Sequence, residues 1–234
     1  MKKIERQSMT ARAIEILRSS IIAGDLKMGA PLMETELSEM LGISRTPIRE
    51  ALSKLQSEGL VVVRPYRGTT VFTVTGDELV DLVDYREVIE VAALRRAMAF
   101  RQKELLIACE DVIKRMKVTV ENEDLRAYLI LDQELHNTLV CSSGSRCLMD
   151  GYSLIEAKMA ALRTALAQTT SRILASFDSH EELLELIRKK RTEEACALLQ
   201  LHVQDGKQLF SSGPGVITGM TPERSEAEEV SVTG

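Results

Sequence analysis

The stretch Ser44-Arg45-Thr46-Pro47-Ile48-Arg49-Glu50-Ala51-Leu52 decides the fold of the first part of this 234-residue chain. Its apolar residues Ile48, Ala51 and Leu52 recur at the spacing that places side chains on one face of a helix. The hydroxyl residues at its start can cap that helix, and a proline is tolerated in a first turn, where the amides have no partner within the helix. The stretch therefore predicts a helix that buries its apolar face.

Two more helices are expected before this one and a β-hairpin after it. Residues 14–21 and 34–41 carry apolar side chains at helical spacing, and a glycine follows each segment. Two β-branched runs, 60–63 and 69–74, flank the basic turn Arg64-Pro65-Tyr66-Arg67-Gly68. This order of elements predicts a winged helix-turn-helix.

The third helix and the hairpin tip carry side chains suited to DNA. Arg45 and Arg49 are four residues apart and share a face near the start of the helix, the part that meets base edges in the major groove. An arginine there can donate two hydrogen bonds to one guanine, and Thr46 can contact a phosphate. Arg67 and Gly68 can reach the backbone or the minor groove. Alternatively the two arginines are solvated side chains on an ordinary surface helix, a hypothesis that the preceding helix and the hairpin disfavour.

The rest of the chain predicts helices alone. No strand pattern follows residue 76, and helical segments are expected over 77–101, 103–120, 124–141, 146–169, 180–190 and 192–210. The expected breaks fall at 121–122, at 142–144, around 169–176 and at 190–192. The expected fold is mainly α. It has a winged helix-turn-helix domain over residues 1–75, an all-α bundle of about six helices over 76–210, and a disordered tail over 211–234.

Charge and composition fit a DNA-binding module joined to a second domain. Residues 1–75 hold 11 Lys/Arg and 8 Asp/Glu, whereas residues 76–234 hold 19 and 27, so a basic part precedes an acidic one. No apolar stretch approaches the roughly 18 residues of a membrane span, and we expect a cytoplasmic protein without a membrane partner. Four cysteines without paired spacing are expected to be reduced and buried.

Four polar residues fall on the inward stripes of the predicted bundle: Asp132, His136, His180 and His202. They include every histidine of the chain, and each would cost roughly 1–3 kcal/mol if it were buried without a partner. One carboxylate and three imidazoles, two of the four ligands being one helical turn apart, suit Zn²⁺, Ni²⁺ or Mn²⁺. The alternative is a set of core histidines, each hydrogen-bonded locally.

The first domain resembles the DNA-binding domain of the GntR family of regulators. The resemblance rests on Gly29-Ala30-Pro31-Leu32, on the run from Glu36 to Leu52, on Leu55-x-x-x-Gly59-Leu60 and on Arg67-Gly68. It implies that the positions that meet DNA are Arg45, Thr46, Arg49 and Gly68.

Residues 77–210 resemble the metal-binding type of the FCD effector domain, which defines the FadR subfamily. The motifs are Asp132-x-x-x-His136, Ser179-His180-Glu181-Glu182-Leu183, His202, and Arg86-x-x-x-Glu90 in the opening helix. The resemblance implies a metal with open positions that an effector carboxylate can take. Arg86 and Arg163 could complete an anion clamp. Alternatively each arginine is a surface or ion-pair residue, with Glu90 as the partner of Arg86.

The predicted function is that of a ligand-responsive repressor. A homodimer would place two recognition helices on a palindromic double-stranded operator, and a small carboxylate or sugar acid would act as the effector. In one alternative the metal is structural or absent. In another the chain is a metalloenzyme with a DNA-binding head, although Glu134 is not placed as a general base for a metal-bound water.

Overall fold

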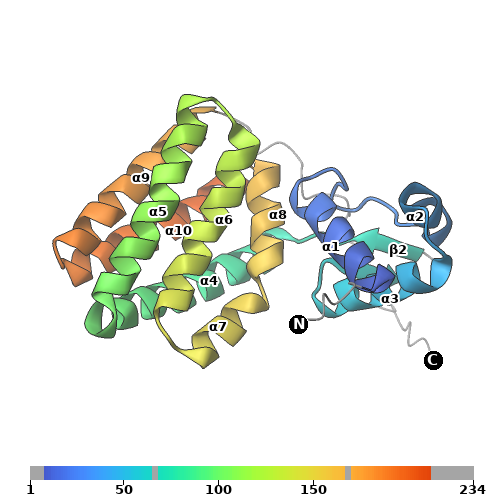
Figure 1. The fold of residues 1–234 in the computed structure, drawn as a ribbon, viewed down its shortest axis with the longest axis horizontal. Helices are drawn as coiled ribbons and strands as arrows, with labels where there is room; N and C mark the ends of the chain where they lie inside the picture. The colour runs from blue at the N-terminus through green and yellow to red at the C-terminus, as the bar shows by residue number, and fades with distance from the viewer. Residues whose placement is uncertain (1–7, 65–67, 167–169, 212–234) are drawn as a thin grey trace, which may run out of the picture.

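The computed structural model describes residues 8–64, 68–166 and 170–211. These residues form two parts that lie side by side, which we call the head (residues 8–74) and the body (residues 76–211) (Figure 1). Apart from one two-stranded hairpin, the regular elements described are α-helices. The prediction of a mainly α fold with a winged helix at its start is confirmed. The residues of the predicted tail beyond residue 211 lie outside the described ranges.

The head has the predicted order of elements: α1 (Met9–Ile22), α2 (Glu34–Leu41), α3 (Arg45–Ser57), β1 (Val61–Arg64) and β2 (Gly68–Val71). Its core forms where the apolar face of α3 meets α1 and the hairpin. Leu17, Ile48, Leu55 and Phe72 are all buried there. Burial of aliphatic and aromatic side chains of this size contributes about 1.5–3 kcal/mol each.

The turn between α2 and α3 sets the direction of α3. Gly42 ends α2 with a φ of 64°, a left-handed conformation that side chains with a Cβ disfavour. The Ser38 hydroxyl donates a hydrogen bond to the carbonyl of Ile43 and closes the turn. Ser44 is the N-cap residue of α3, but its side chain makes no capping hydrogen bond, so the expected hydroxyl cap at this residue is wrong. The Ser38 contact holds the turn instead.

The hairpin pairs β1 and β2 in antiparallel register, from Val61 opposite Val71 to Arg64 opposite Gly68. Gly68 has a φ of 81°, and a Cβ there would meet nothing within 4 Å. The backbone conformation therefore favours glycine, and the space beside it is open to a close ligand. Arg67 at the hairpin tip lies outside the described residues.

The body contains seven helices in the described ranges: α4 (Gly76–Phe100), α5 (Gln102–Glu121), α6 (Leu125–Ser142), α7 (Arg146–Ser153), α8 (Glu156–Leu166), α9 (Thr170–Arg188) and α10 (Thr192–Ser211). The single helix expected over 146–169 is wrong, because the chain turns at Leu154 and Ile155 and forms α7 and α8. The break expected over residues 169–176 is also wrong, because α9 begins at Thr170.

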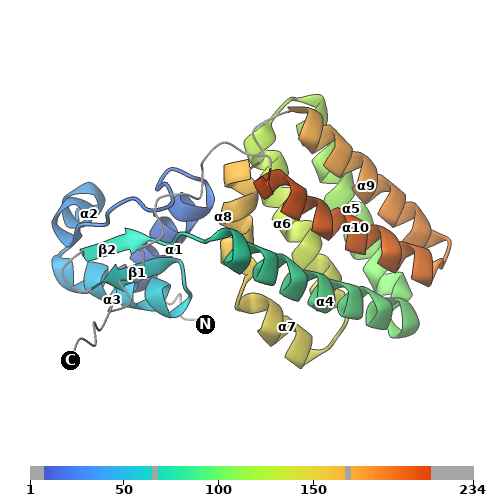
Figure 2. The ribbon, with the colours of Figure 1, turned by 180° about the vertical axis from the view of Figure 1, so that it is seen from behind.

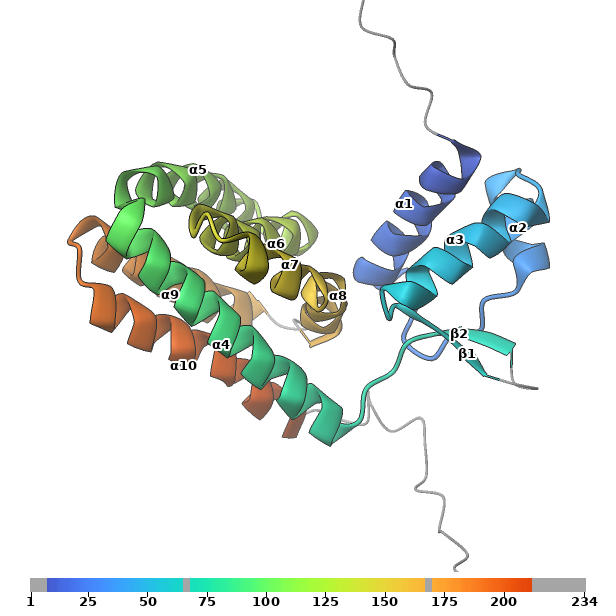
Figure 3. The ribbon, with the colours of Figure 1, turned by 90° about the horizontal axis from the view of Figure 1, so that it is seen from below.

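The helices of the body form two layers (Figure 3). α4, α9 and α10 make one layer, α5, α6 and α7 make the other, and α8 lies at the end of the bundle nearest the head (Figures 1 and 2). Thr75 and Glu78 form a capping box at the start of α4. None of the helices in the described ranges has the length and apolar character needed to cross a membrane.

Candidate metal centre and nucleic-acid interface

Three helices bring the four predicted ligands together between the layers of the body. Asp132 and His136 lie one turn apart on α6, His180 lies on α9 and His202 on α10. Each offers one ligand atom, and these atoms all lie within 4.8 Å of one another. Asp132, His136 and His180 are buried and His202 is half-buried. The cluster is therefore a candidate site for a metal ion.

The spacing of the ligand atoms agrees with such a site. The Nε2 atoms of His180 and His202 are 3.1 Å apart, and Asp132 Oδ1 lies 3.7 Å from His180 Nε2. Two nitrogen ligands in a tetrahedral zinc site lie about 3.3 Å apart, as their bond lengths of roughly 2.0–2.1 Å require. His136 Nε2 is buried and has no hydrogen-bond partner among the described residues. A bound cation would satisfy this atom, so the residues present fit a metal.

A buried carboxylate fixes the orientation of His136. Glu90 on α4 lies with Oε2 2.8 Å from His136 Nδ1, and its other oxygen accepts a hydrogen bond of 2.7 Å from Arg86 Nε. With Nδ1–H donated to Glu90, His136 presents Nε2 to the cluster. The sequence analysis named Glu90 only as a partner for Arg86. Its place on the buried stripe of α4, one turn after Arg86, is the pattern that could have revealed this role.

The electrostatics of the cluster suit a divalent cation. Burial lowers the pKa of His136 and His202 well below the usual value, and that of His180 to about 4. Burial alone would raise the pKa of Asp132, but the charge of Arg163, followed by those of the neighbouring groups, outweighs it and lowers the pKa. At neutral pH the cluster therefore offers three neutral imidazoles and one carboxylate, the protonation states that metal ligands require.

Two arginines next to the cluster carry N–H groups that lack hydrogen-bond partners among the described residues. Arg86 is buried and ion-paired with Glu90, so the expected Arg86–Glu90 pair is present. Arg163 Nε on α8 lies 3.0 Å from Asp132 Oδ2, an ion pair without hydrogen-bond geometry. Within the described ranges, Arg86 Nη2, all three nitrogens of Arg163 and the hydroxyl of Tyr152 are buried without a hydrogen-bond partner. An anion could accept hydrogen bonds from these groups.

Two polar contacts of the body bear on these assignments. Tyr128 lies with its hydroxyl 3.4 Å from His180 Nδ1 and donates to Ser176, and sequence reasoning did not identify it as a neighbour of the cluster. Glu134, which lies between Asp132 and His136 in the sequence, pairs with Arg115 at the exposed side of α6. It therefore points away from the cluster.

The predicted DNA-contacting side chains of α3 lie at its exposed start. Arg45 and Thr46 are exposed in the first turn, and Arg49 follows one turn later. Arg49 donates two hydrogen bonds to Glu34 on α2, of 2.9 Å and 2.7 Å. This hydrogen bonding lowers the pKa of Glu34. The pair holds the Arg49 guanidinium extended from the surface.

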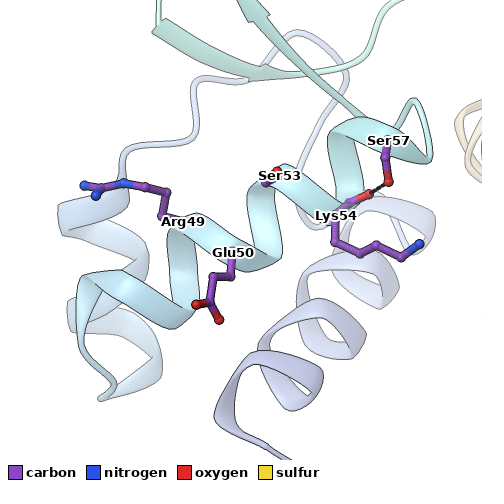
Figure 4. A pocket seen from close by; sticks show the side chains of 5 residues that line it. All are labelled: Arg49, Glu50, Ser53, Lys54 and Ser57. Carbon is purple, nitrogen blue, oxygen red and sulfur yellow. Dashed lines mark hydrogen bonds between the residues drawn. The ribbon is translucent and has the colours of Figure 1, made fainter.

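A shallow hollow runs along the exposed side of α3, lined by Arg49, Glu50, Ser53, Lys54 and Ser57 (Figure 4). Arg49 points to the opposite side of the helix from Glu50 and Lys54 (Figure 4). Glu50 accepts a hydrogen bond from Thr10 of α1, and Lys54 pairs with Glu58. All three charges are paired within the head, and Arg49 lies on the side of α3 that faces α2.

The chain matches two protein-family models in the order that the fold shows. Residues 9–71 match the model described as bacterial regulatory proteins of the gntR family, and residues 81–205 match the FCD domain. An HTH-type transcriptional repressor of Escherichia coli K12, RspR, is 24% identical over 199 residues, which cover 85% of this chain and 87% of the relative.

A second relative and a solved structure agree with these matches. The gluconate operon transcriptional repressor of Bacillus licheniformis is 27% identical and covers 81% of this chain and 79% of its own length. A solved GntR-type transcriptional regulator from Rhodococcus sp. RHA1 covers 87% of this chain and 98% of its own, with 22% identity and a TM-score of 0.78, and so shares the fold. The relatives are regulators rather than enzymes. The chain belongs to the GntR family of bacterial regulatory proteins and carries an FCD domain after its DNA-binding domain.

Proposed function

We propose that this chain is a ligand-responsive repressor of the FadR subfamily that senses a small organic acid through a metal-containing pocket. The observation that carries the proposal is the buried cluster of three neutral imidazoles and one carboxylate, bordered by two arginines. A metal held there would supply a Lewis-acidic position for an effector carboxylate. The domain division at residues 75 and 76 belongs to the same proposal.

In the head, Arg45, Thr46 and Arg49 contact operator DNA from the start of α3. Arg45 and Arg49 donate hydrogen bonds to base edges, and Thr46 contacts a phosphate. Arg67 and Gly68 of the wing approach the backbone or the minor groove. Two copies of the chain form a homodimer, which places two such helices on the half-sites of a palindromic operator.

In the body, Asp132, His136, His180 and His202 hold the metal, with Zn²⁺ or Ni²⁺ preferred and Mn²⁺ as a further candidate. Nitrogen ligands favour zinc and nickel over manganese, which prefers oxygen. Glu90 supports this set, because a carboxylate behind a ligating imidazole fixes the tautomer.

The effector is a small carboxylate or a sugar acid. Arg163 and Arg86 carry buried donors without hydrogen-bond partners among the described residues, as an anion clamp needs. The name of the Bacillus licheniformis relative refers to gluconate, a sugar acid, and supports this class of effector.

The test is a screen of thermal stability followed by DNA binding. Zinc-loaded protein is screened against short carboxylates and sugar acids, and an operator is recovered from a random duplex library by selection. We expect one acid to raise the melting temperature by a few degrees, as about 1–2 kcal/mol of binding free energy would, and to change operator affinity. Arg163→Lys is expected to lose the acid response and keep zinc. An acid response that is equal in the zinc-loaded and chelator-treated proteins would instead favour a structural or absent metal.

A further inference from the structure

Helix α8 has one face toward the metal cluster and another toward the head. Arg163 lies with Nε 3.0 Å from Asp132 Oδ2. Lys158 is five residues earlier, which places it roughly 140° around the helix, and its ammonium lies 6.0 Å from the centre of the Phe72 ring in the head. Figure 3 shows α8 between the bundle and the head, beside α1. The two side chains therefore join the cluster and the head through one short helix.

Two glycines of the head lie against side chains of α8. A Cβ at Gly59 would lie 2.5 Å from Lys158 Cε, so the glycine leaves room for the lysine side chain. A Cβ at Gly24, in the turn after α1, would lie 3.7 Å from Thr164 Cγ2. These contacts pack α8 against two separate segments of the head.

Helix α6, which carries two of the four ligands, reaches the same surface. Arg126 pairs with Asp25 of the head across 3.3 Å, and Asn137 donates a hydrogen bond to Glu156 at the start of α8. The Arg126 pair is exposed and contributes little to stability. The stronger connection is the packed contact of α8.

Arg163 and a bound cation would compete for the carboxylate of Asp132. The carboxylate now faces the Arg163 guanidinium, which makes no hydrogen bond within the described ranges. A divalent cation held by Asp132 and the imidazoles would place a like charge beside this guanidinium in a buried region, where charges are poorly screened. Arg163 would then have to turn from Asp132 toward an anion, and α8 would move with it.

We propose that α8 is the element that transmits metal and effector binding to the DNA-binding head, with Arg163 sensing the cluster and Lys158 holding the head. This inference rests on the proposed metal site. The other connection runs from β2 into α4, whose Glu90 bonds to His136, and it passes through the capped start of that helix.

The first experiment measures amide hydrogen exchange of the full chain with and without Zn²⁺. The reporters are the amides of Gly24 and Leu26, which donate to Ile21 and Ser20 in the turn that faces α8. Local opening of such hydrogen bonds sets their exchange rates. We expect zinc to change these rates by about threefold or more in the wild type, since a shift of about 0.7 kcal/mol in local stability suffices.

Lys158→Ala is the test variant and Lys189→Ala the matched control, because Lys189 is an exposed lysine just after α9. Both variants are expected to bind zinc within about twofold of the wild type, as distant substitutions usually do. The exchange response of the head should persist in Lys189→Ala and be lost in Lys158→Ala. An undiminished response in Lys158→Ala would overturn the role of α8.

Arg163→Met tests the competition for Asp132. Removal of the guanidinium is expected to strengthen zinc binding by about tenfold, because a like charge is removed from a buried site, and to abolish the response of the head. Weaker zinc binding by a folded Arg163→Met protein would contradict the competition. Failure of the wild type to bind zinc would overturn the metal site and this proposal together. Zinc binding by the wild type without any response in the head would overturn this proposal alone.

Discussion

At the scale of single residues, Glu90 is the side chain that favours a metal site over a set of core histidines with local hydrogen bonds. It is fully buried and lies between Arg86 and His136. A core histidine needs only one local partner, whereas this arrangement occupies Nδ1 and leaves Nε2 directed at two other imidazoles and a carboxylate. Support of this kind behind a ligating imidazole strengthens metal binding.

Glu90→Gln is therefore expected to weaken zinc binding by about 10–100-fold, the usual effect of losing such a partner. Competition with a chromophoric chelator measures the affinity. Glu104→Gln, an exposed acid in the first turn of α5, is the control and should bind zinc as the wild type does. Equal zinc affinity in Glu90→Gln and the wild type would argue that His136 is not a ligand.

Arg49 allows a second prediction at this scale. Arg49→Ala should lower operator affinity by about tenfold or more, because a bidentate contact to guanine contributes about 1–3 kcal/mol of discrimination. The melting temperature should change little, since the Arg49–Glu34 pair is exposed. Fluorescence anisotropy with a selected operator measures the loss, and Arg146→Ala on α7 is the control. Full affinity in the Arg49→Ala variant would mean that α3 is not the recognition helix.

The sequence predicted the ligand cluster but not its partners. Asp132 and His136 were found because an i, i+4 pair on an apolar stripe must face the core. The contact of Arg163 with Asp132 joins residues on different helices, and no spacing along the chain encodes it. The role of Glu90 depends in the same way on the packing of α4 against α6.

At the scale of elements, the division of residues 146–166 into α7 and α8 positions the proposed transmission helix. The sequence Tyr152-Ser153-Leu154-Ile155 holds neither glycine nor proline, so local propensity favoured one helix. Tyr152 and Ile155 are both buried and Leu154 is exposed, a pattern that a continuous helix would also give, so this spacing does not encode the turn. α9 likewise begins at Thr170, where the sequence predicted a loop.

The capping box of α4 supports the junction of head and body. Thr75 accepts a hydrogen bond of 3.2 Å from the amide of Glu78, and the Thr75 amide donates one of 2.8 Å to the Glu78 carboxylate. Thr75→Ala should lower the free energy of unfolding by about 1 kcal/mol, the usual cost of losing an N-cap side chain. Denaturant unfolding of the full chain measures it. Thr75→Ser is the control and should stay close to the wild type; an equal loss in both variants would show that the hydroxyl is not what matters.

At the scale of the whole molecule, the buried imidazoles make stability depend on pH. Their pKa values are lowered in the folded state, so the unfolded chain binds more protons below pH 6.5. The stabilisation is complete above the unfolded pKa and is lost as pH falls below it, by up to about 1.4 kcal/mol per pH unit for each histidine.

Chelator-treated protein should therefore melt at a clearly lower temperature at pH 5.5 than at pH 7.5. Differential scanning calorimetry measures this change. The interval from pH 7.5 to 8.5 serves as the control, because histidines do not titrate there, and should be nearly flat. A melting temperature that rises as the pH falls from 7.5 to 5.5 would show that the histidines gain protons on folding.

The winged head and the helical body correspond to the two family models that the chain matches, the gntR model over residues 9–71 and the FCD domain over 81–205. The basic head and acidic body agree with this division, since only the head needs to approach phosphates. In the proposed function, the two parts are joined by the cluster of Asp132, His136, His180 and His202, which lies between the layers of the bundle.

The most direct test of this account is the metal content of protein purified without a metal-affinity tag, measured by elemental analysis beside melting in chelator. The account predicts about one equivalent of zinc or nickel per chain, a lower melting temperature after chelation, and loss of the metal in His136→Ala, because bound metal stabilises the folded state. Less than about a tenth of an equivalent, with melting unchanged by chelator, would contradict a metal-containing sensor.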